Sequence, residues 1–175
     1  MKTILYTILF LLSIDFYAQS FIEKYEDNDN VSSVLVTEEM FKMLGSIEPE
    51  GQKAKEELDV LKDLTGLRII STDENQYKTQ ILNDVKKYIS SHNLKELLRI
   101  NDKDAKVIFY VIKGDKPYIA KELVMLMIKK EQPEEVVVMD LTGKINLKKI
   151  SKLNSKVNMI DKKYFEEVEQ KMNNK

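Results

Sequence analysis

The sequence predicts a single α+β domain, in which helices pack on a mixed but mainly antiparallel sheet. Two strand-like segments near the N-terminus alternate with helical patterns, whereas four strand-like segments follow one another later in the chain. Helices and strands that are partly separated along a chain are typical of α+β folds. Short linkers rich in Asp, Gly and Pro join the four later segments, and such linkers favour hairpins. We therefore expect a four-strand C-terminal meander that the two early strands extend.

The first 18 residues have the composition of an export signal that is cleaved from the mature protein. Lys2 supplies a positive charge, residues 4–14 are almost entirely apolar, and small residues follow at Ala18 and Ser20. The apolar run is too short to span a hydrocarbon core of about 30 Å, which requires roughly 20 helical residues. We expect cleavage after Ala18, or alternatively after Ser20, with no transmembrane segment afterwards. The mature chain is then exported, to the periplasm or the medium.

Apolar periodicity assigns the elements of the mature chain. Alternating or continuous apolar runs predict strands at residues 31–36, 67–71, 94–101, 105–113, 118–129 and 135–141. Helical spacing predicts helices at residues 38–45, 53–61, 77–89, 145–153 and 160–172. The predicted organisation is a signal (1–18), an acidic approach segment (19–30), the α+β domain (31–155), and a C-terminal amphipathic helix with a charged tail (156–175).

Capping and turn residues support these boundaries. Thr37 is placed to cap the first helix, and Thr72 or Asp73 to cap the long helix over residues 77–89. Thr65-Gly66 leads into the second strand, and Thr142-Gly143 is expected to turn from the last strand into a helix. Residues 107–112 and 123–128 are apolar on both sides of the pleat, so we expect them in inner strands with both faces covered.

Composition excludes several classes of function. The chain has 28 basic and 29 acidic residues and a formal net charge of −1, so no strong field attracts nucleic acid. It has no cysteine, which excludes disulfides, thiol catalysis, cysteine-bound metals and a lipid anchor on an N-terminal cysteine. Stability must therefore come from an apolar core, which a chain of about 150 residues can supply.

Individual motifs do not predict a catalytic, cofactor or metal site. His92, the single histidine, follows a helical pattern and is better explained by the negative end of the helix than by catalysis or metal binding. The Asp27-Asn28-Asp29-Asn30 run offers oxygen ligands, but Val31 and Ser32 stand where a calcium loop needs its glycine and its turn. Asp102-Lys103-Asp104 lies between two predicted strands, where Asp favours turns. Gly143-Lys144 lacks the glycine-rich start of a phosphate loop.

Paired acids and methionines also have plain structural explanations. The pairs Glu56-Glu57, Glu134-Glu135 and Glu166-Glu167 are expected to be solvated, because adjacent side chains point in different directions. Met40, Met43, Met125 and Met127 are expected to fill the core rather than to line an adaptable groove for a partner.

Four segments together resemble a known family. They are residues 21–27 (FIEKYED), 31–34 (VSSV), 64–70 (LTGLRII) and 136–147 (VVVMDLTGKINL). The arrangement is similar to exported bacterial proteins of the domain-of-unknown-function 4252 family, of the Bacteroidota type, over residues 21–153. Many members of that family look like lipoproteins, whereas this chain has no cysteine to acylate. The resemblance implies no established activity and no site residues.

These observations leave three hypotheses open. The first is a small exported envelope protein without enzymatic activity, which binds a protein partner or an envelope ligand through a sheet face or an edge strand. The second is a hydrolase that uses carboxylates, which requires two acids from distant segments in a cleft, one with a perturbed pKa. The third is a self-associating domain with a structural or stress-related role in the envelope.

Overall fold

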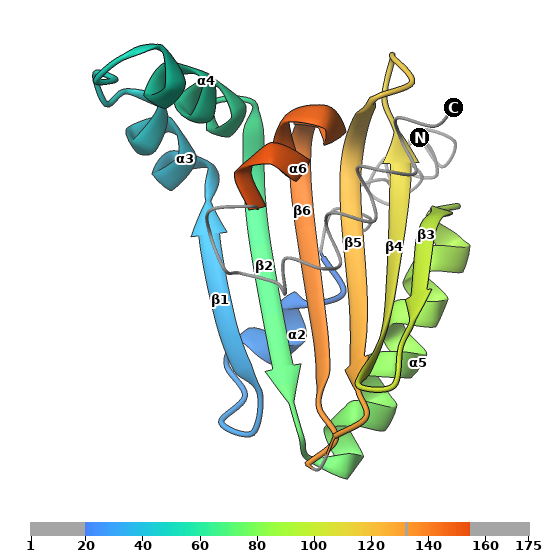
Figure 1. Cartoon of the computed structure of the whole chain (residues 1–175). Coiled ribbons are helices and arrows are strands. Elements are labelled where there is room, and N and C mark those ends of the chain that lie inside the picture. The colour runs from blue at the N-terminus through green and yellow to red at the C-terminus, as the bar shows by residue number, and fades with distance from the viewer. Residues whose placement is uncertain (1–19, 132, 155–175) are drawn as a thin grey trace, which may run out of the picture.

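The described part of the chain forms a six-stranded sheet with helices on both faces (Figure 1). The computed structural model describes residues 20–131 and 133–154. The strand order is β1-β2-β6-β5-β4-β3. The strands are β1 (Ser32–Thr37), β2 (Leu64–Thr72), β3 (Lys95–Asn101), β4 (Ala105–Lys113), β5 (Ile119–Lys129) and β6 (Val136–Asn146).

The α+β class and the four-strand meander are confirmed. Strands β3 to β6 follow one another in both sequence and space, and β2 and then β1 extend the sheet beyond β6. The apolar segments expected in inner strands lie in β4 and β5, which have neighbours on both sides. Every neighbouring pair is antiparallel, so the sheet is not mixed. Hairpins between β3 and β6 enforce this direction, because a tight turn reverses the chain.

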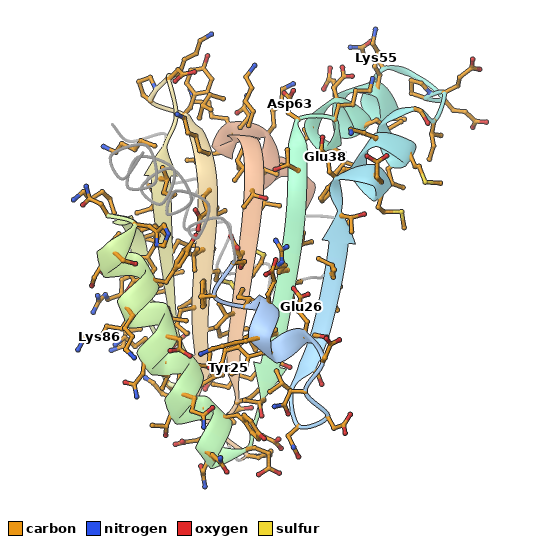
Figure 2. The ribbon with its side chains drawn as sticks, turned by 180° about the vertical axis from the view of Figure 1, so that it is seen from behind. Tyr25, Glu26, Glu38, Lys55, Asp63 and Lys86 are labelled. Atoms are coloured by element: carbon orange, nitrogen blue, oxygen red, sulfur yellow. The ribbon has the colours of Figure 1, made fainter. Side chains whose placement is uncertain are left out.

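The helices divide between the two faces of the sheet. They are α2 (Glu23–Glu26), α3 (Glu38–Gly45), α4 (Gln52–Leu61), α5 (Asn75–Ser91) and α6 (Leu147–Asn154). Helices α2 and α5 cover one face, which Figure 2 presents to the viewer. Residues of α3, α4 and α6 pack on the opposite face, near one end of the sheet. Thr37 caps α3 as predicted, since its Oγ accepts a hydrogen bond from the Met40 amide at 3.4 Å.

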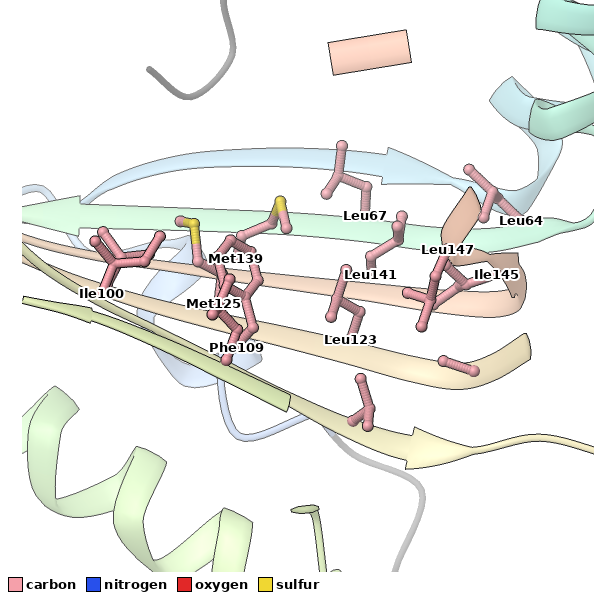
Figure 3. Packing of buried hydrophobic residues seen from close by; sticks show 14 of the residues in the cluster. Leu64, Leu67, Ile100, Phe109, Leu123, Met125, Met139, Leu141, Ile145 and Leu147 are labelled. Carbon is pink, nitrogen blue, oxygen red and sulfur yellow. The ribbon is translucent and has the colours of Figure 1, made fainter. Parts of the chain in front are cut away.

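The face opposite α5 carries the larger apolar core (Figure 3). Phe109 of β4, Met125 of β5 and Met139 of β6 are register partners on adjacent strands, and each is at most 5% exposed. Phe41 of α3 and Leu147 of α6 pack against the same cluster. Helix α6 therefore follows β6 directly and folds back over the sheet.

A second apolar core lies between α5 and the sheet. Ile81 and Val85, one turn apart on α5, are fully buried against residues of the central strands such as Val124 and Val138. Ile22 and Tyr25 complete this core from the segment that the sequence treats as a polar approach. Their burial brings Ser20, the first described residue, close to the sheet, where its Oγ contacts Asp140 of β6.

The predicted turn at Thr142-Gly143 is wrong, because β6 continues through it to Asn146. Leu64 pairs with Gly143, and Ile119 pairs with Asn146, so strands on both sides extend β6 beyond the expected end. Ile145 is consequently a buried strand residue rather than a helical one.

Other boundaries shift by a few residues. Strand β2 includes Thr65-Gly66 instead of beginning after them. The long helix begins at Asn75, and Glu74 is its N-cap residue. Thr72, one of the two residues expected to cap this helix, accepts a hydrogen bond from the Glu74 amide, which lies just before the helix. The C-terminal helix expected at residues 160–172 and the export signal lie outside the described residues.

We predict that Gly143→Ala destabilises the domain far more than Gly51→Ala. Both glycines have positive φ, +125° and +92°, so both alanines carry about 1–2 kcal/mol of backbone strain. A Cβ at Gly143 would also lie 2.4 Å from the Asp63 carbonyl oxygen, whereas a Cβ at Gly51 meets nothing within 4 Å. Crowding of this kind adds about 1–3 kcal/mol. Equilibrium urea unfolding of both variants measures the difference, and equal losses would contradict the assigned strand geometry.

Candidate functional site

Two carboxyl groups are buried beneath the layer formed by α2 and α5. Glu122 of β5 and Asp140 of β6 are 7% and 2% exposed. Charged side chains are almost never buried to this degree unless they are paired, so their surroundings decide their chemistry. We call Glu122, Asp140, Tyr88, Arg68 and Ser20 the buried carboxylate cluster.

Strand alternation directs both acids toward the helices. Glu122 is two residues from Val124, and Asp140 is two residues from Val138, so each acid points to the same face of the sheet as its neighbouring valine. These two valines belong to the core under α5. The register pairs Val124 with Asp140 and Glu122 with Thr142, so the two acids are diagonal neighbours on one face. Such neighbours are roughly 7–8 Å apart, within reach of long side chains.

The hydrogen bonds of the cluster satisfy only half of its carboxyl oxygens. Ser20 Oγ donates to Asp140 Oδ2 at 3.2 Å, and the Tyr88 hydroxyl bonds to Glu122. Asp140 Oδ1 and Glu122 Oε1 are buried with no hydrogen-bond partner among the described residues. Each unsatisfied buried group costs about 1–3 kcal/mol. The site therefore has two acceptor positions open to a donor.

The cluster also holds more acid than base. Arg68 faces Asp140, but its Nε and Nη2 pair with Glu26 at 2.9 Å and Glu23 at 3.2 Å. Three carboxyl groups, those of Glu23, Glu26 and Asp140, thus share one guanidinium, and Glu122 adds a fourth acid to this part of the structure. Lys24 does not supply a second positive charge to these carboxyl groups, because its ammonium pairs with Asp84 at 2.5 Å.

Burial shifts the pKa values of both acids upward, and like charge adds to the shift of Glu122. Desolvation, followed by repulsion from Asp140, raises the pKa of Glu122 to about 7, against an opposing hydrogen bond from Tyr88. Desolvation also raises the pKa of Asp140, while the bond from Ser20 and the charge of Arg68 act in the opposite direction. Glu122 therefore changes charge near neutral pH.

Tyr88 covers the cluster from α5. Burial is the main cause that raises the pKa of its hydroxyl, and the neighbouring Glu122 and Asp140 add to it. Its ring lies 4.5 Å from that of Phe21 and stacks on His92 at 4.1 Å. These contacts hold the tyrosine over the acids and connect it to the first described residues.

A second candidate surface is the free edge of the sheet at β1. Val34 and Leu35 project to opposite faces and are 54% and 49% exposed, and Ser32–Thr37 contains no charged residue and no proline. Met40, Met43 and Ile47 continue the exposed apolar surface onto and just beyond α3. We call Val34, Leu35, Met40, Met43 and Ile47 the β1 edge surface.

The opposite edge, β3, is protected in ways that β1 is not. It carries an ion pair between Glu96 and Arg99 and a register shift between Glu96 and Leu98. Charges and irregularities are common devices against unwanted strand pairing at sheet edges. Strand β1 pairs with β2 without a register shift. The two edges of one sheet therefore differ in their capacity to accept another strand.

His92 lies where the sequence predicts, at the C-terminal end of α5. Its Nδ1 is 3.2 Å from the Tyr88 carbonyl oxygen and 3.0 Å from Ser91 Oγ. Its ring contact with Tyr88 brings it near the buried carboxylate cluster without a direct contact to either acid.

The two oxygen-rich runs serve as turns. Asn28 Oδ1 accepts from the Asn30 amide at 2.9 Å, and the Asn30 carbonyl accepts from Thr72 Oγ1 at 2.8 Å. Asp102 Oδ1 accepts from the Lys103 amide between β3 and β4. Within the ranges that the structure describes, no group of three or more potential ligands forms a metal site.

The Gly143-Lys144 motif lies within strand β6. The Lys144 amide donates a hydrogen bond to the Asp63 carbonyl oxygen.

The paired acids are dispersed, whereas the methionines divide between core and surface. Glu56 contacts Gln52 on α4, Glu134 lies near Lys78, and Glu135 pairs with Lys129. The Glu57 side chain and Glu166-Glu167 lie outside the described residues.

Met125 is 1% exposed and Met127 packs against the same core, as expected. Core filling is wrong for Met40 and Met43, which are 49% and 67% exposed, because the side of α3 that carries them faces away from the sheet.

The buried carboxylate cluster was not predicted from the sequence. A signal was present, since Glu122 and Asp140 each interrupt an apolar strand at an inward-facing phase. Their proximity was not visible, because it depends on the register between β5 and β6 and on its shift between Ala120 and Glu122.

The fold and the site define a small α+β domain with an open antiparallel sheet and an acidic cluster under one helical layer. The chain belongs to the family described as Domain of unknown function (DUF4252), whose family model matches residues 25–153. The match spans all six strands of the sheet. No curated protein and no solved structure matches the chain. None of the helices in the described ranges is both long and apolar enough to cross a membrane.

We predict that Glu122→Gln removes a pH dependence of stability. The pKa of Glu122 rises from an ordinary 4.5 to about 7 on folding, so the folded state binds the extra proton. Stability from this group is full below pH 4.5 and is lost as pH rises to 7, by on the order of 3 kcal/mol. In a chain with an N-terminal tag ahead of residue 19, urea unfolding at pH 4.5 and 8 should show this loss in the wild type and not in the variant.

A matched substitution serves as the control. Glu96→Gln on the exposed edge strand β3 should keep the loss between pH 4.5 and 7, because Glu96 lies outside the cluster. An unchanged loss in Glu122→Gln would contradict the pKa assigned to Glu122.

Proposed function

We propose that this protein is an exported binding module that accepts an extended segment of a partner protein along the free edge of β1. The observation that carries the proposal is the unprotected β1 edge, with Val34 and Leu35 about half exposed, in a sheet whose other edge is protected. A peptide that adds a strand gains main-chain hydrogen bonds, and its alternate side chains contact both faces.

The surroundings of β1 indicate the chemistry of the partner. Val34 on one face and Leu35 on the other favour a segment with apolar side chains on both of its faces. Asp27 and Asp29 precede β1, and Glu38 and Glu39 follow it, so both ends of the strand are acidic. Charge complementarity therefore favours a segment with basic residues at its ends.

The exposed side chains of α3 enlarge the same surface. Met40 and Met43 have unbranched side chains that adapt to different partners, and Ile47 lies beyond the end of the helix. A partner that continues past the end of β1 meets this apolar patch.

Self-association through β1 is less well supported. An antiparallel pair of β1 strands brings the end of each strand that follows Asp27 and Asp29 toward the end of the other copy that leads into Glu38 and Glu39, and like charges that approach each other are unfavourable. A dimer of the purified chain is nonetheless a defined outcome of the binding test below.

A carboxylate-dependent hydrolase is the second candidate, and the Glu122–Asp140 pair is the observation that favours it. Two acids from adjacent strands with raised pKa values meet one requirement of such an enzyme. Both acids are at least nine-tenths buried under Ser20 and Tyr88, however, and a hydrolase needs them in contact with substrate. Loss of a measured hydrolytic activity in Glu122→Gln with retained folding would reverse the order of the two candidates.

We predict that charge on β1 abolishes peptide binding. The probe is a fluorescent synthetic peptide of alternating valine and threonine with a lysine at each end, measured by anisotropy. Val34→Lys with Leu35→Lys should weaken binding at least tenfold, because lysines on the edge repel the basic ends and remove the apolar contacts. Leu97→Lys on β3, which replaces an exposed apolar residue of the other edge, should leave binding unchanged.

Two further measurements sharpen this test. A peptide with two consecutive prolines at its centre should not bind, because one of the two must face β1 and proline cannot donate to a strand ladder. Equal loss in Leu97→Lys, or equal binding of the proline peptide, would contradict strand addition at β1. A concentration-dependent dimer in light scattering that Leu35→Lys dissociates would identify a second copy as the occupant instead.

We predict that the chain loses its leader on export. Intact-mass analysis of the natural protein should show a chain that begins at Gln19, or at Phe21 if cleavage follows Ser20. Retention of Met1 on the purified native polypeptide would contradict export by a cleaved signal.

A further inference from the structure

We infer that Glu122 and Asp140 form a pH-sensitive latch, which holds residues 20–26 on the sheet while Glu122 is neutral and favours their release once both acids are ionised. We call residues 20–26, which include helix α2, the α2 strap. The latch is independent of the binding proposed at β1, because its switching requires no partner.

The α2 strap contacts both members of the acid pair. Ser20 Oγ donates to Asp140 Oδ2 at 3.2 Å. The ring of Phe21 lies 4.5 Å from that of Tyr88, whose hydroxyl bonds to Glu122. A change in the charge of the pair therefore acts directly on the first two residues of the strap.

Of the two elements that cover this face, the α2 strap is the easier to displace. Figure 2 shows α2 over the strands beside α5, and the Tyr25 hydroxyl donates to Asp84 of α5 at 2.5 Å. Helix α2 has four residues, whereas α5 has seventeen and is held by the buried Ile81 and Val85. Short elements with few buried side chains open more readily than long ones. Water therefore reaches the acids at the least cost in free energy when the strap moves.

Ionisation of Glu122 places a second negative charge in a site that lacks donors for it. Glu122 Oε1 and Asp140 Oδ1 are buried without a hydrogen-bond partner among the residues that the structure describes. Desolvation, followed by the charge of Asp140, raises the pKa of Glu122 to about 7. Asp140 has a bond from Ser20 and the charge of Arg68 in its favour, so Glu122 is the second acid of the pair to ionise.

The other charged and titratable groups that pack on this face do not offset the new charge. They are Arg68 on β2, Glu23 and Glu26 on α2, Tyr88 and His92 on α5, and Tyr110 on β4. Arg68 is already shared by Glu23, Glu26 and Asp140. Lys24, Tyr25 and Lys87 act on Asp84 instead. Hydration after displacement of the strap is then the remaining way to stabilise both charges.

The direction of the switch follows from the raised pKa of Glu122. With the strap closed the pKa is about 7, and with the acid hydrated it returns toward 4.5. The closed state is therefore fully favoured below pH 4.5, and this advantage is lost as pH rises to 7. The difference of 7 − 4.5 = 2.5 units corresponds to at most a roughly 300-fold increase in the equilibrium constant for opening.

The experiment uses a single thiol as a reporter of strap opening, since the natural chain has no cysteine. Ile22→Cys, in the chain with a tag ahead of residue 19, places the thiol at a strap position that is 0% exposed. Its reaction rate with uncharged dithiodipyridine, divided by the rate in the urea-unfolded chain at the same pH, gives the equilibrium constant for opening. Val107→Cys, at a fully buried position of β4 in the core on the other face, reports global unfolding.

We expect the opening constant at position 22 to increase at least tenfold between pH 5.5 and pH 8. The thiol at position 107 should react at least tenfold more slowly at both pH values, because the sheet stays folded when the strap opens. An opening constant that does not change with pH would overturn the latch. Equal reactivity at the two positions at pH 8 would also overturn it, because the whole domain would then open and not the strap.

Substitutions assign the effect to Glu122. Glu122→Gln should abolish the increase at position 22, because glutamine stays neutral, whereas Glu96→Gln on β3 and His92→Asn should retain it. An increase that persists in Glu122→Gln, or that disappears in His92→Asn, would overturn the latch. If Ile22→Cys does not fold, hydrogen exchange of the Tyr25 amide, which donates to the Ile22 carbonyl at 2.8 Å, decides the question with the natural residues in place. Its opening constant should show the same increase, and a constant value would overturn the latch.

Discussion

Two-sided burial of the central strands is the constraint on which the rest of the structure depends. Strands β5 and β6 have the larger core on one face and the core under α5 on the other, so successive side chains along them leave water in both directions. An acidic side chain on either face of these strands is then removed from water, as its neighbours are. Apolar side chains of similar size would cost less free energy at Glu122 and Asp140. Stability alone therefore does not account for these two acids.

The same sheet has edges of opposite character. Strand β3 is closed to further pairing by the Glu96–Arg99 ion pair and a register shift, and β1 is open. A six-stranded sheet could be protected equally at both ends, so the difference is a property of these residues and not of the fold. The exposed methionines of α3 lie next to the open edge and not next to the closed one.

Sequence patterns were sufficient for the class of fold and for the succession of elements along the chain from β1 to α6, but not for α2 or for the full order of strands in the sheet. The meander follows from short turns between apolar runs, and the cap at Thr37 follows from local chemistry that needs no tertiary information. The end of β6 was missed because pairing with Leu64 and Ile119, both distant in sequence, extends the strand through Gly143. The carboxylate cluster was missed for a related reason, since strand register determines which acids meet. Exposure of Met40 and Met43 depends on which side of α3 faces the sheet, and helical spacing alone does not show this.

The two candidate sites are linked by the segment between Ser20 and β1. Helix α2 lies over the sheet through the contacts of Glu23 and Glu26 with Arg68, and Arg68 is the register partner of Leu35 in β1. Ser33 Oγ donates to the Glu26 carbonyl at 2.9 Å, and Val31 is buried in the core under α5. A contact that holds Ser20 on the acids therefore also restrains α2, and α2 restrains the start of β1. Since an edge strand binds a partner with less loss of entropy when its own backbone is already fixed, the Ser20–Asp140 contact supports the strand addition that we propose at β1.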